Sequence, residues 1–269
     1  MTTIPAPGPT MPAARLWCRI SAAAAAATVL SQIVWVLVGE ELRDAVTVAT
    51  VVLFATASLS HAIATRGPRW AARFAVIAIT VGWTAEALGT TTGWPFGSYD
   101  YADSLGAKLG PVPLVIPLAW LMMAYPVLLA ARRVTARASL QTLYAAGLLT
   151  AWDLFLDPQM VAEGHWVWQD ADALALPGIP GIPVQNYAGW FLVGLLLFAA
   201  AAALLPDDGA HDDRVPAGLL LWVLLSNAMA NAVFWGRPAV ALLGGLAMGL
   251  LLLPWLRSGI LERGFWVRA

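Results

Sequence analysis

Long apolar stretches alternate with short polar connections along almost the whole chain. They lie at about 16–39, 45–64, 70–89, 112–131, 139–157, 187–205, 216–235 and 238–256. An α-helix needs about 20 mostly apolar residues to cross the hydrocarbon core of a bilayer. The stretches lack the alternation of apolar and polar positions that is typical of transmembrane β-strands. The pattern therefore predicts an all-α protein, a polytopic transmembrane helix bundle with eight spanning helices.

The composition supports a membrane protein. Hydrophobic residues make up 60% of the 269 residues and charged residues 12%, whereas a soluble domain carries about 25% charged residues. The formal net charge is −1 and the chain has a single cysteine, Cys18. Neither nucleic-acid binding nor a disulfide framework is expected from these values. We expect a multi-pass protein of the cell membrane, with the lipid bilayer as its surroundings.

The basic residues predict the orientation, because cytoplasmic loops are enriched in Lys and Arg. If the connections alternate between the two sides, all but three of the 15 basic residues fall on one side; the exceptions are Arg43, Lys108 and Arg237. Both termini are then cytoplasmic, as an even number of helices requires. We further expect a disordered segment at 1–14, a single helical domain at 15–257 and a cytoplasmic tail at 258–269.

Three carboxylates are predicted inside the bilayer, where an ionised group costs several kcal/mol. Glu86 lies near the outer end of the third span. Asp153 and Asp157 lie four residues apart in the fifth span, which places them on the same helix face. Two carboxylates so close in a poorly solvated site do not both ionise, so one keeps a proton. We therefore interpret Asp153, Asp157 and Glu86 as candidate catalytic residues, with a general acid among them.

Amide and aromatic side chains are predicted in the same outer layer. Asn186 begins the sixth span, and Asn231 follows Asn227 by four residues in the seventh. Aromatic rings favour the membrane interface in any case, but their faces also stabilise cations. The candidate substrate-binding residues are Trp94, Tyr99, Tyr101, Trp166, Trp168, Asn186, Trp190 and Asn231.

The sequence gives no sign of a metal or a nucleotide cofactor. The three histidines, His61, His165 and His211, fall in different parts of the predicted topology and show no metal-ligand spacing. No glycine-rich phosphate-binding fingerprint follows a strand. His165 is interpreted as a loop residue, although a role in proton supply would fit its position after Glu163.

Two long connections, at 90–111 and 158–186, are expected on the outer side, and several strings in and beside them resemble a known family. They are EALG at 86–89, TGWPFGSYDY at 92–101, PVP at 111–113, PLAW at 117–120, AWDLFLDP at 151–158, GHWVW at 164–168 and GIPVQNYAGW at 181–190. Their order and spacing resemble the carotenoid biosynthesis membrane proteins of the bisanhydrobacterioruberin hydratase and carotenoid 1,2-hydratase type. The resemblance covers about residues 80–195.

The resemblance implies cofactor-independent addition of water to the terminal double bond of an acyclic carotenoid. It also implies a carotenoid substrate and leaves room for other carotenoid-pathway enzymes as partners. The residues fit this reaction, because a neutral carboxylic acid is needed to protonate an isolated alkene. Our hypothesis from the sequence makes Asp153 the acid, with Asp157 or Glu86 positioning water.

Two other readings stay open at this point. A carotenoid cyclase shares the cation chemistry and needs no water, whereas a prenyl-transferring elongase would need Asp-rich motifs on the cytoplasmic side. A transporter or a non-catalytic membrane partner is a different class. Transporters often place polar groups near the midplane between repeats, and here the polar groups are expected near one face.

Overall fold

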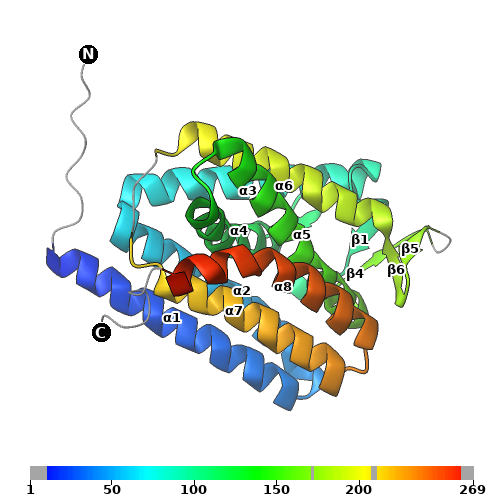
Figure 1. Ribbon diagram of the computed structural model, residues 1–269. Coiled ribbons are helices and arrows are strands. Elements are labelled where there is room, and N and C mark those ends of the chain that lie inside the picture. Colours follow the sequence, from blue (N-terminus) through cyan, green and yellow to red (C-terminus); the bar gives the residue numbers. More distant parts are fainter. Residues whose placement is uncertain (1–10, 171–172, 207–210, 262–269) are drawn as a thin grey trace.

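The computed structural model describes residues 11–170, 173–206 and 211–261, and this part of the chain holds eight long helices (Figure 1). They are α1 (Met11–Leu37), α2 (Glu40–Arg66), α3 (Pro68–Thr92), α4 (Val115–Val134), α5 (Ala138–Ala162), α6 (Val184–Leu204), α7 (Arg214–Met229) and α8 (Pro238–Leu261). A π-helical turn, η2 (Ala230–Phe234), continues α7. All eight predicted spans correspond to these helices, so the predicted all-α bundle is confirmed.

Seven of the described helices are long and apolar enough to cross a membrane, and α5 is the one that does not meet both conditions. Its 25 residues extend about 37 Å at 1.5 Å per residue, which exceeds a hydrocarbon core of about 30 Å. Its composition is more polar because it carries Asp153, Asp157 and several Gln and Thr residues. α5 packs against α4, α6 and α8, so these polar groups face protein.

α4 is the central helix of the bundle. Its side chains from Trp120 to Ala131 are all buried, and it contacts α2, α3, α5, α7 and α8. The outer helices instead expose large apolar side chains, for example Leu242, Leu246 and Leu250 on α8. An inner helix surrounded by helices with apolar outer faces is the arrangement expected in lipid.

Three two-stranded sheets lie at one end of the bundle. β1 (Tyr99–Tyr101) pairs antiparallel with β4 (Trp166–Trp168), β2 (Lys108–Leu109) with β3 (Val112–Pro113), and β5 (Ala175–Leu176) with β6 (Ile179–Pro183). A short 3₁₀ turn, η1 (Asp103–Leu105), follows β1. The β1–β4 pair joins the two long connections that the sequence places on the same side.

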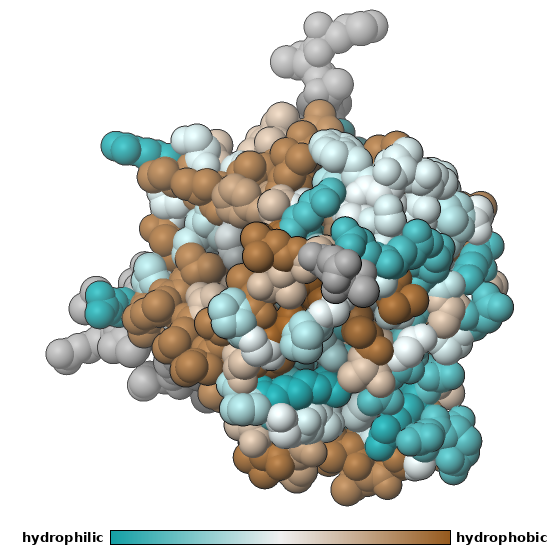
Figure 2. Space-filling view, turned by 90° about the vertical axis from the view of Figure 1, so that its right-hand side faces the viewer, coloured by the Kyte–Doolittle hydropathy of each residue, from teal (hydrophilic) through white to brown (hydrophobic). Residues whose placement is uncertain are grey.

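The two ends of the bundle differ in what they present. Figure 2 looks onto the end that carries the strands, where hydrophilic side chains cover much of the surface and hydrophobic ones gather along its left side. α1 begins and α8 ends at the opposite end (Figure 1), as an even number of helices requires. The assignment of that end to the cytoplasm remains a prediction. α1 starts four residues inside the predicted N-terminal segment, and residues 1–10 and 262–269 lie outside the described residues.

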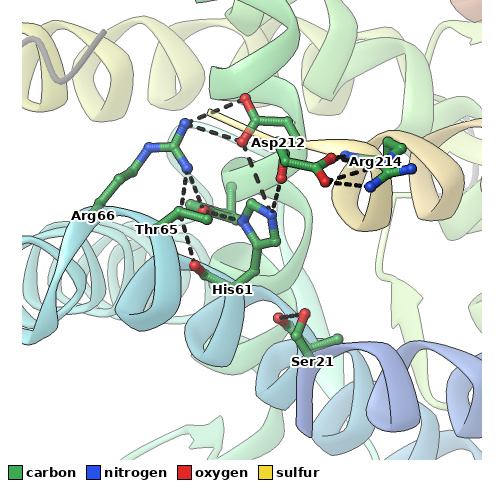
Figure 3. A network of polar contacts seen from close by, with 9 residues as sticks. Ser21, His61, Thr65, Arg66, Asp212 and Arg214 are labelled. Carbon is green, nitrogen blue, oxygen red and sulfur yellow. Dashed lines mark hydrogen bonds and ion pairs between the residues drawn. The ribbon is translucent and has the colours of Figure 1, made fainter. Parts of the chain in front are cut away.

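The opposite end is held by a charged network (Figure 3). Arg66, at the end of α2, donates to the Tyr125 hydroxyl on α4 at 3.0 Å and to the Asp213 carboxylate at 3.1 Å. His61 contacts the same hydroxyl through Nδ1 at 2.8 Å and the Asp212 carbonyl through Nε2 at 2.9 Å. Arg214 pairs with the Asp212 carboxylate, which lowers the pKa of that carboxyl. The network ties the start of α7 to α2 and α4.

Candidate active site

Glu86 is buried in the last third of α3 and accepts three hydrogen bonds from aromatic side chains. Trp120 Nε1 of α4 donates to Oε1 at 2.8 Å. The Tyr101 hydroxyl donates to Oε2 at 2.8 Å, and the Tyr99 hydroxyl donates to the same oxygen. Burial and the adjacent Glu86 raise the pKa of both tyrosines, which keeps their hydroxyls protonated as donors. Because a Trp N–H can only donate, Glu86 Oε1 acts as an acceptor in its contact with Trp120.

Asp153 and Asp157 lie on one face of α5 and share a single amide donor. Asn186 Nδ2, in the first turn of α6, donates to Asp153 Oδ2 at 2.8 Å and also to Asp157 Oδ2. Trp166 Nε1 of β4 donates to Asp157 Oδ1 at 3.2 Å. Asp153 Oδ1 is buried and has no hydrogen-bond partner in the described structure. The Asn186 amide therefore bridges the two carboxyl groups.

Backbone geometry places the aromatic donors. Tyr99 and Tyr101 are two residues apart on β1 and therefore point to the same side of the strand. Their partners on β4 are Trp168 opposite Tyr99 and Trp166 opposite Tyr101. One short antiparallel pair thus supplies the two hydroxyls to Glu86 and the indole N–H to Asp157, although the two strands lie far apart in the sequence.

Two glycines let the loop after α3 enter the bundle. A Cβ at Gly89 of α3 would lie 2.8 Å from the Phe96 ring, and one at Gly189 of α6 would lie 2.7 Å from the same ring. Any larger residue at either position would push the ring out. Phe96 is buried and packs near Trp190, which stacks on Trp120 with ring centroids 4.1 Å apart.

A cavity of about 60 Å³ lies between these groups. Glu86 and Asp157 are both on its wall, with aromatic and aliphatic side chains around them. The lining comprises Tyr99, Tyr101, Trp120, Trp166, Trp168, Asn186 and Trp190, with Thr47, Val51, Phe96, Leu105, Val115, Ile116, Ala119, Met122, Leu156 and Met160. Because one water needs about 10–15 Å³ of such space, the cavity has room for a few water molecules beside an acid and a carboxylate.

Comparison with known proteins places this site in a family. Residues 46–254 match the family described as "Carotenoid biosynthesis protein". The chain belongs to this family. The match includes all the residues that line the cavity, so the site lies within the part that defines the family.

A curated relative carries a more specific name. The chain is 34% identical over 195 residues to the "Bisanhydrobacterioruberin hydratase" of Haloarcula japonica, an alignment that covers 67% of this chain. The chain spans 63% of that relative's length. No solved structure matches the chain. The resemblance to the carotenoid biosynthesis family that the sequence motifs indicate is therefore confirmed.

The structure brings most of the predicted site residues of this carotenoid biosynthesis protein to one cavity. Glu86, Asp157, Tyr99, Tyr101, Trp166, Trp168, Asn186 and Trp190 all line it. Asp153 lies behind Asp157 and is fully buried, away from the wall. Trp94 is exposed. Asn231 is buried on η2, where its side-chain amide donates to the Asn227 carbonyl at 2.9 Å, and it does not line the cavity.

The sequence prediction omitted Trp120, which donates to Glu86 and lines the cavity. It lies within an apolar run, where a single Trp is easily interpreted as part of the interfacial belt. Its place in the PLAW string was the available signal. His165 is buried instead of lying in an open loop; its Nδ1 contacts Ser104 Oγ at 2.8 Å. Burial lowers the pKa of His165.

No metal-binding group appears in the described part of the chain. No three His, Cys, Asp or Glu side chains come together there in an arrangement that could hold a metal ion. The three site carboxylates are contacted by neutral donors, namely indole, phenol and amide groups. The arrangement combines three carboxyl groups, neutral hydrogen-bond donors and aromatic surfaces around one cavity.

Proposed function

We propose that this chain adds water to the terminal carbon–carbon double bond of an acyclic carotenoid and so forms a tertiary alcohol. The observation that carries the proposal is the cavity wall, which holds both Glu86, with its three donors, and Asp157, which shares one amide donor with Asp153 behind it. The family and the name of the Haloarcula relative support an enzyme of carotenoid biosynthesis and favour hydration.

The first step is protonation of the alkene. Asp153 and Asp157 share one proton, because two buried carboxylates bridged by one amide cannot both ionise without a large cost. Asp157 faces the cavity and Asp153 does not, so Asp157 delivers the proton and Asp153 positions it. The proton adds to the less substituted alkene carbon, and the electron pair of the double bond forms the new C–H bond. The other carbon becomes a tertiary cation.

The second step is capture of the cation by water. Aromatic rings on the cavity wall, among them Trp166 and Trp168, stabilise the cation. Glu86 orients a cavity water, which forms the new C–O bond and gives up one proton to a carboxylate. Return of this proton to the Asp153–Asp157 pair through cavity water restores the enzyme. The reaction transfers no electrons, so it needs no redox cofactor.

Cyclisation is the second candidate, since it also begins with protonation of an alkene. A cyclase has to keep water from the cation, and its cation must be attacked by a neighbouring double bond. The cavity has a second carboxylate, Glu86, placed to hold water. This observation, together with the relative's name, favours hydration.

Pigment analysis tests the proposal. The chain is produced in a bacterial host that makes lycopene, and the pigments are separated by chromatography and weighed by mass spectrometry. We expect a gain of one water mass for each modified end. An isomer of unchanged mass would indicate cyclisation, and unchanged lycopene with the protein present in the membrane would contradict the proposal.

Two variants assign the acid. Asp157→Asn is expected to abolish the product, whereas Asp153→Asn, which removes the partner of the acid, is expected to lower its amount. The hypothesis from the sequence, with Asp153 as the acid, gives the opposite ranking. Product formed by Asp157→Asn but not by Asp153→Asn, at equal protein levels, would return the role to Asp153.

A further inference from the structure

A second, larger cavity lies beside the carboxylate site. It encloses about 320 Å³ between α1, α2, α5, α7 and η2, which is within the range of small-molecule binding sites, roughly 300–1,000 Å³. Five residues belong to the walls of both cavities: Thr47, Val51, Met122, Leu156 and Met160. The two spaces are therefore separated by single side chains.

The wall of this second cavity suits a hydrocarbon. None of its described lining residues is charged, and aromatic rings contributed by Trp35, Trp152, Trp222 and Phe234 dominate it. Several of its polar groups are already bonded within the protein. Trp35 Nε1 donates to Thr47 Oγ1 at 2.9 Å, and the indole N–H of Trp222 donates to Gln32. A polar ligand would find few hydrogen-bonding groups there that are not already bonded within the protein, whereas an apolar ligand does not need such groups.

α1 and α7 lie next to each other (Figure 1), and the lining of the cavity reaches the outer surface on both helices. Four residues of its lining are exposed and apolar: Ile33 and Leu37 near the end of α1, and Met229 and Phe234 at the end of α7 and in η2. These turns belong to the same end of the bundle as the carboxylates. The π-helical turn at this opening is a feature that frequently occurs at functional sites.

The side chains between the two cavities can move aside. Met122 and Met160 are unbranched, with several rotatable bonds, and adapt to irregular spaces. Leu156 precedes Asp157 directly on α5. A shift of these side chains would join the second cavity to the wall that carries Asp157 and Glu86.

We propose that the second cavity is a lateral channel that admits a polyene from the lipid and holds its chain while the end group reaches Asp157. This inference rests on the proposed function, since it takes the carotenoid as the occupant. A long, uncharged polyene dissolves in the bilayer, and an opening lined by lipid-exposed apolar residues admits it without passage through water. A phospholipid acyl chain is the competing occupant.

The test adds bulk to the cavity after the protein has folded. Ser226 lines the cavity and Leu225, its neighbour on α7, is exposed on the outer surface. Each is changed to cysteine in a Cys18→Ala background, and the purified protein in lipid nanodiscs is treated with a hexyl methanethiosulfonate. Each protein is compared before and after treatment, so that misfolding of a bulky variant cannot explain a loss.

Two readouts separate this inference from the proposed function. Lycopene binding is measured by quenching of tryptophan fluorescence, also in an Asp157→Asn background that performs no chemistry, and turnover is measured by product mass. Treatment of the Ser226→Cys protein is expected to reduce both binding and turnover about tenfold or more, because an overfilled cavity excludes its ligand. Treatment of the Leu225→Cys protein is expected to change neither.

Retained lycopene binding in the treated Ser226→Cys protein would overturn the channel. The channel would also be overturned if a phospholipid with a labelled acyl chain quenched the tryptophan fluorescence and lycopene did not. The cavity would then be a lipid-binding site. Binding that depends on Ser226 without any hydration product would keep the polyene site and contradict the proposed reaction instead.

Discussion

The two ends of the bundle each hold a cluster of acidic groups, buried at the strand end and partly exposed at the opposite end, and the two clusters are stabilised in different ways. At the end shown in Figure 3, Asp213 pairs with Arg66 and Asp212 with Arg214. At the strand end, no described Lys, Arg or His forms an ion pair with Glu86, Asp153 or Asp157. Their partners are neutral O–H and N–H groups. A cationic partner keeps a carboxylate ionised. Two neighbouring carboxyl groups that contact only neutral donors can instead retain a proton between them.

The difference indicates what each cluster contributes. The Arg66–Asp213 ion pair joins α2 to the start of α7, and therefore connects segments that are far apart in sequence. The neutral-donor cluster holds three acids close together at a cost in stability, because uncompensated burial of charge is unfavourable. Such a cost is typical of sites that carry chemistry. Changing a carboxylate to an amide should therefore lower turnover at the strand end and leave it nearly unchanged at the opposite end.

The largest expected effect comes from changing one carboxylate to an amide at each end. Glu86→Gln leaves one oxygen acceptor and places an NH₂ group among three donors, so water is no longer held by an anion. We expect the rate of product formation to fall by about 10²–10³-fold. Asp213→Asn, the matched change at the opposite end, is expected to leave the rate per folded molecule close to that of the unaltered protein.

Both variants are purified in nanodiscs, and turnover of lycopene is normalised to the folded fraction. Equal loss of turnover in the two variants would remove the distinction between the clusters. Unchanged turnover in Glu86→Gln would remove Glu86 from the reaction and leave water to be held by the Asp153–Asp157 pair.

The fold was largely predictable because lipid imposes a simple requirement on sequence. Each span must be long and apolar, so the eight runs alone place the helices. The ends were less accurate: the predicted span at 45–64 is α2 at 40–66, and the last turn of the span at 216–235 is π-helical. Capping and local hydrogen bonds such as Arg237 N to the Asn231 carbonyl determine these ends, and hydropathy does not report them.

The site was predictable only in part. The spacing of Asp153 and Asp157 places them on one face, but their depth relative to the cavity depends on how α5 is rotated against α4 and α6. The β1–β4 pair was not predicted, because two three-residue strands about 70 residues apart leave no recognisable pattern. For the same reason, the hydroxyl donors of Glu86 could be named as aromatic candidates but not assigned to it.

A smaller effect, on stability, is expected from removal of the cation at the opposite end. Arg66→Met leaves Asp213 without its ion-pair partner and removes a donor from the Tyr125 hydroxyl. Because Asp213 keeps some access to solvent, we expect a loss of about 1–3 kcal/mol in the free energy of unfolding. Arg69→Met, the same change at an exposed residue nearby, is the control and is expected to have little effect.

Thermal unfolding in nanodiscs measures this difference, and turnover is followed at a temperature where both variants are folded. We expect the rate of Arg66→Met to stay close to that of Arg69→Met. Similar unfolding temperatures for the two variants would show that the ion pair does not hold the start of α7. A rate that falls in Arg66→Met alone would connect this end to the chemistry.

The smallest expected effect concerns His165, the buried histidine beside the strand end. Burial lowers its pKa more than the nearby Asp44 and Glu163 raise it. The folded protein then binds fewer protons at this site than the unfolded chain, whose histidine pKa is about 6.5. Its contribution to stability is complete above about pH 6.5 and is lost as the pH falls below that value.

Melting curves at about pH 7.5 and 5.5, compared with those of His165→Gln, measure the contribution of His165. We expect the unaltered protein to lose about 2–4 °C more than the variant on acidification. Gln can keep the contact with Ser104 and does not titrate, so an equal loss in both proteins would show that His165 does not couple pH to folding.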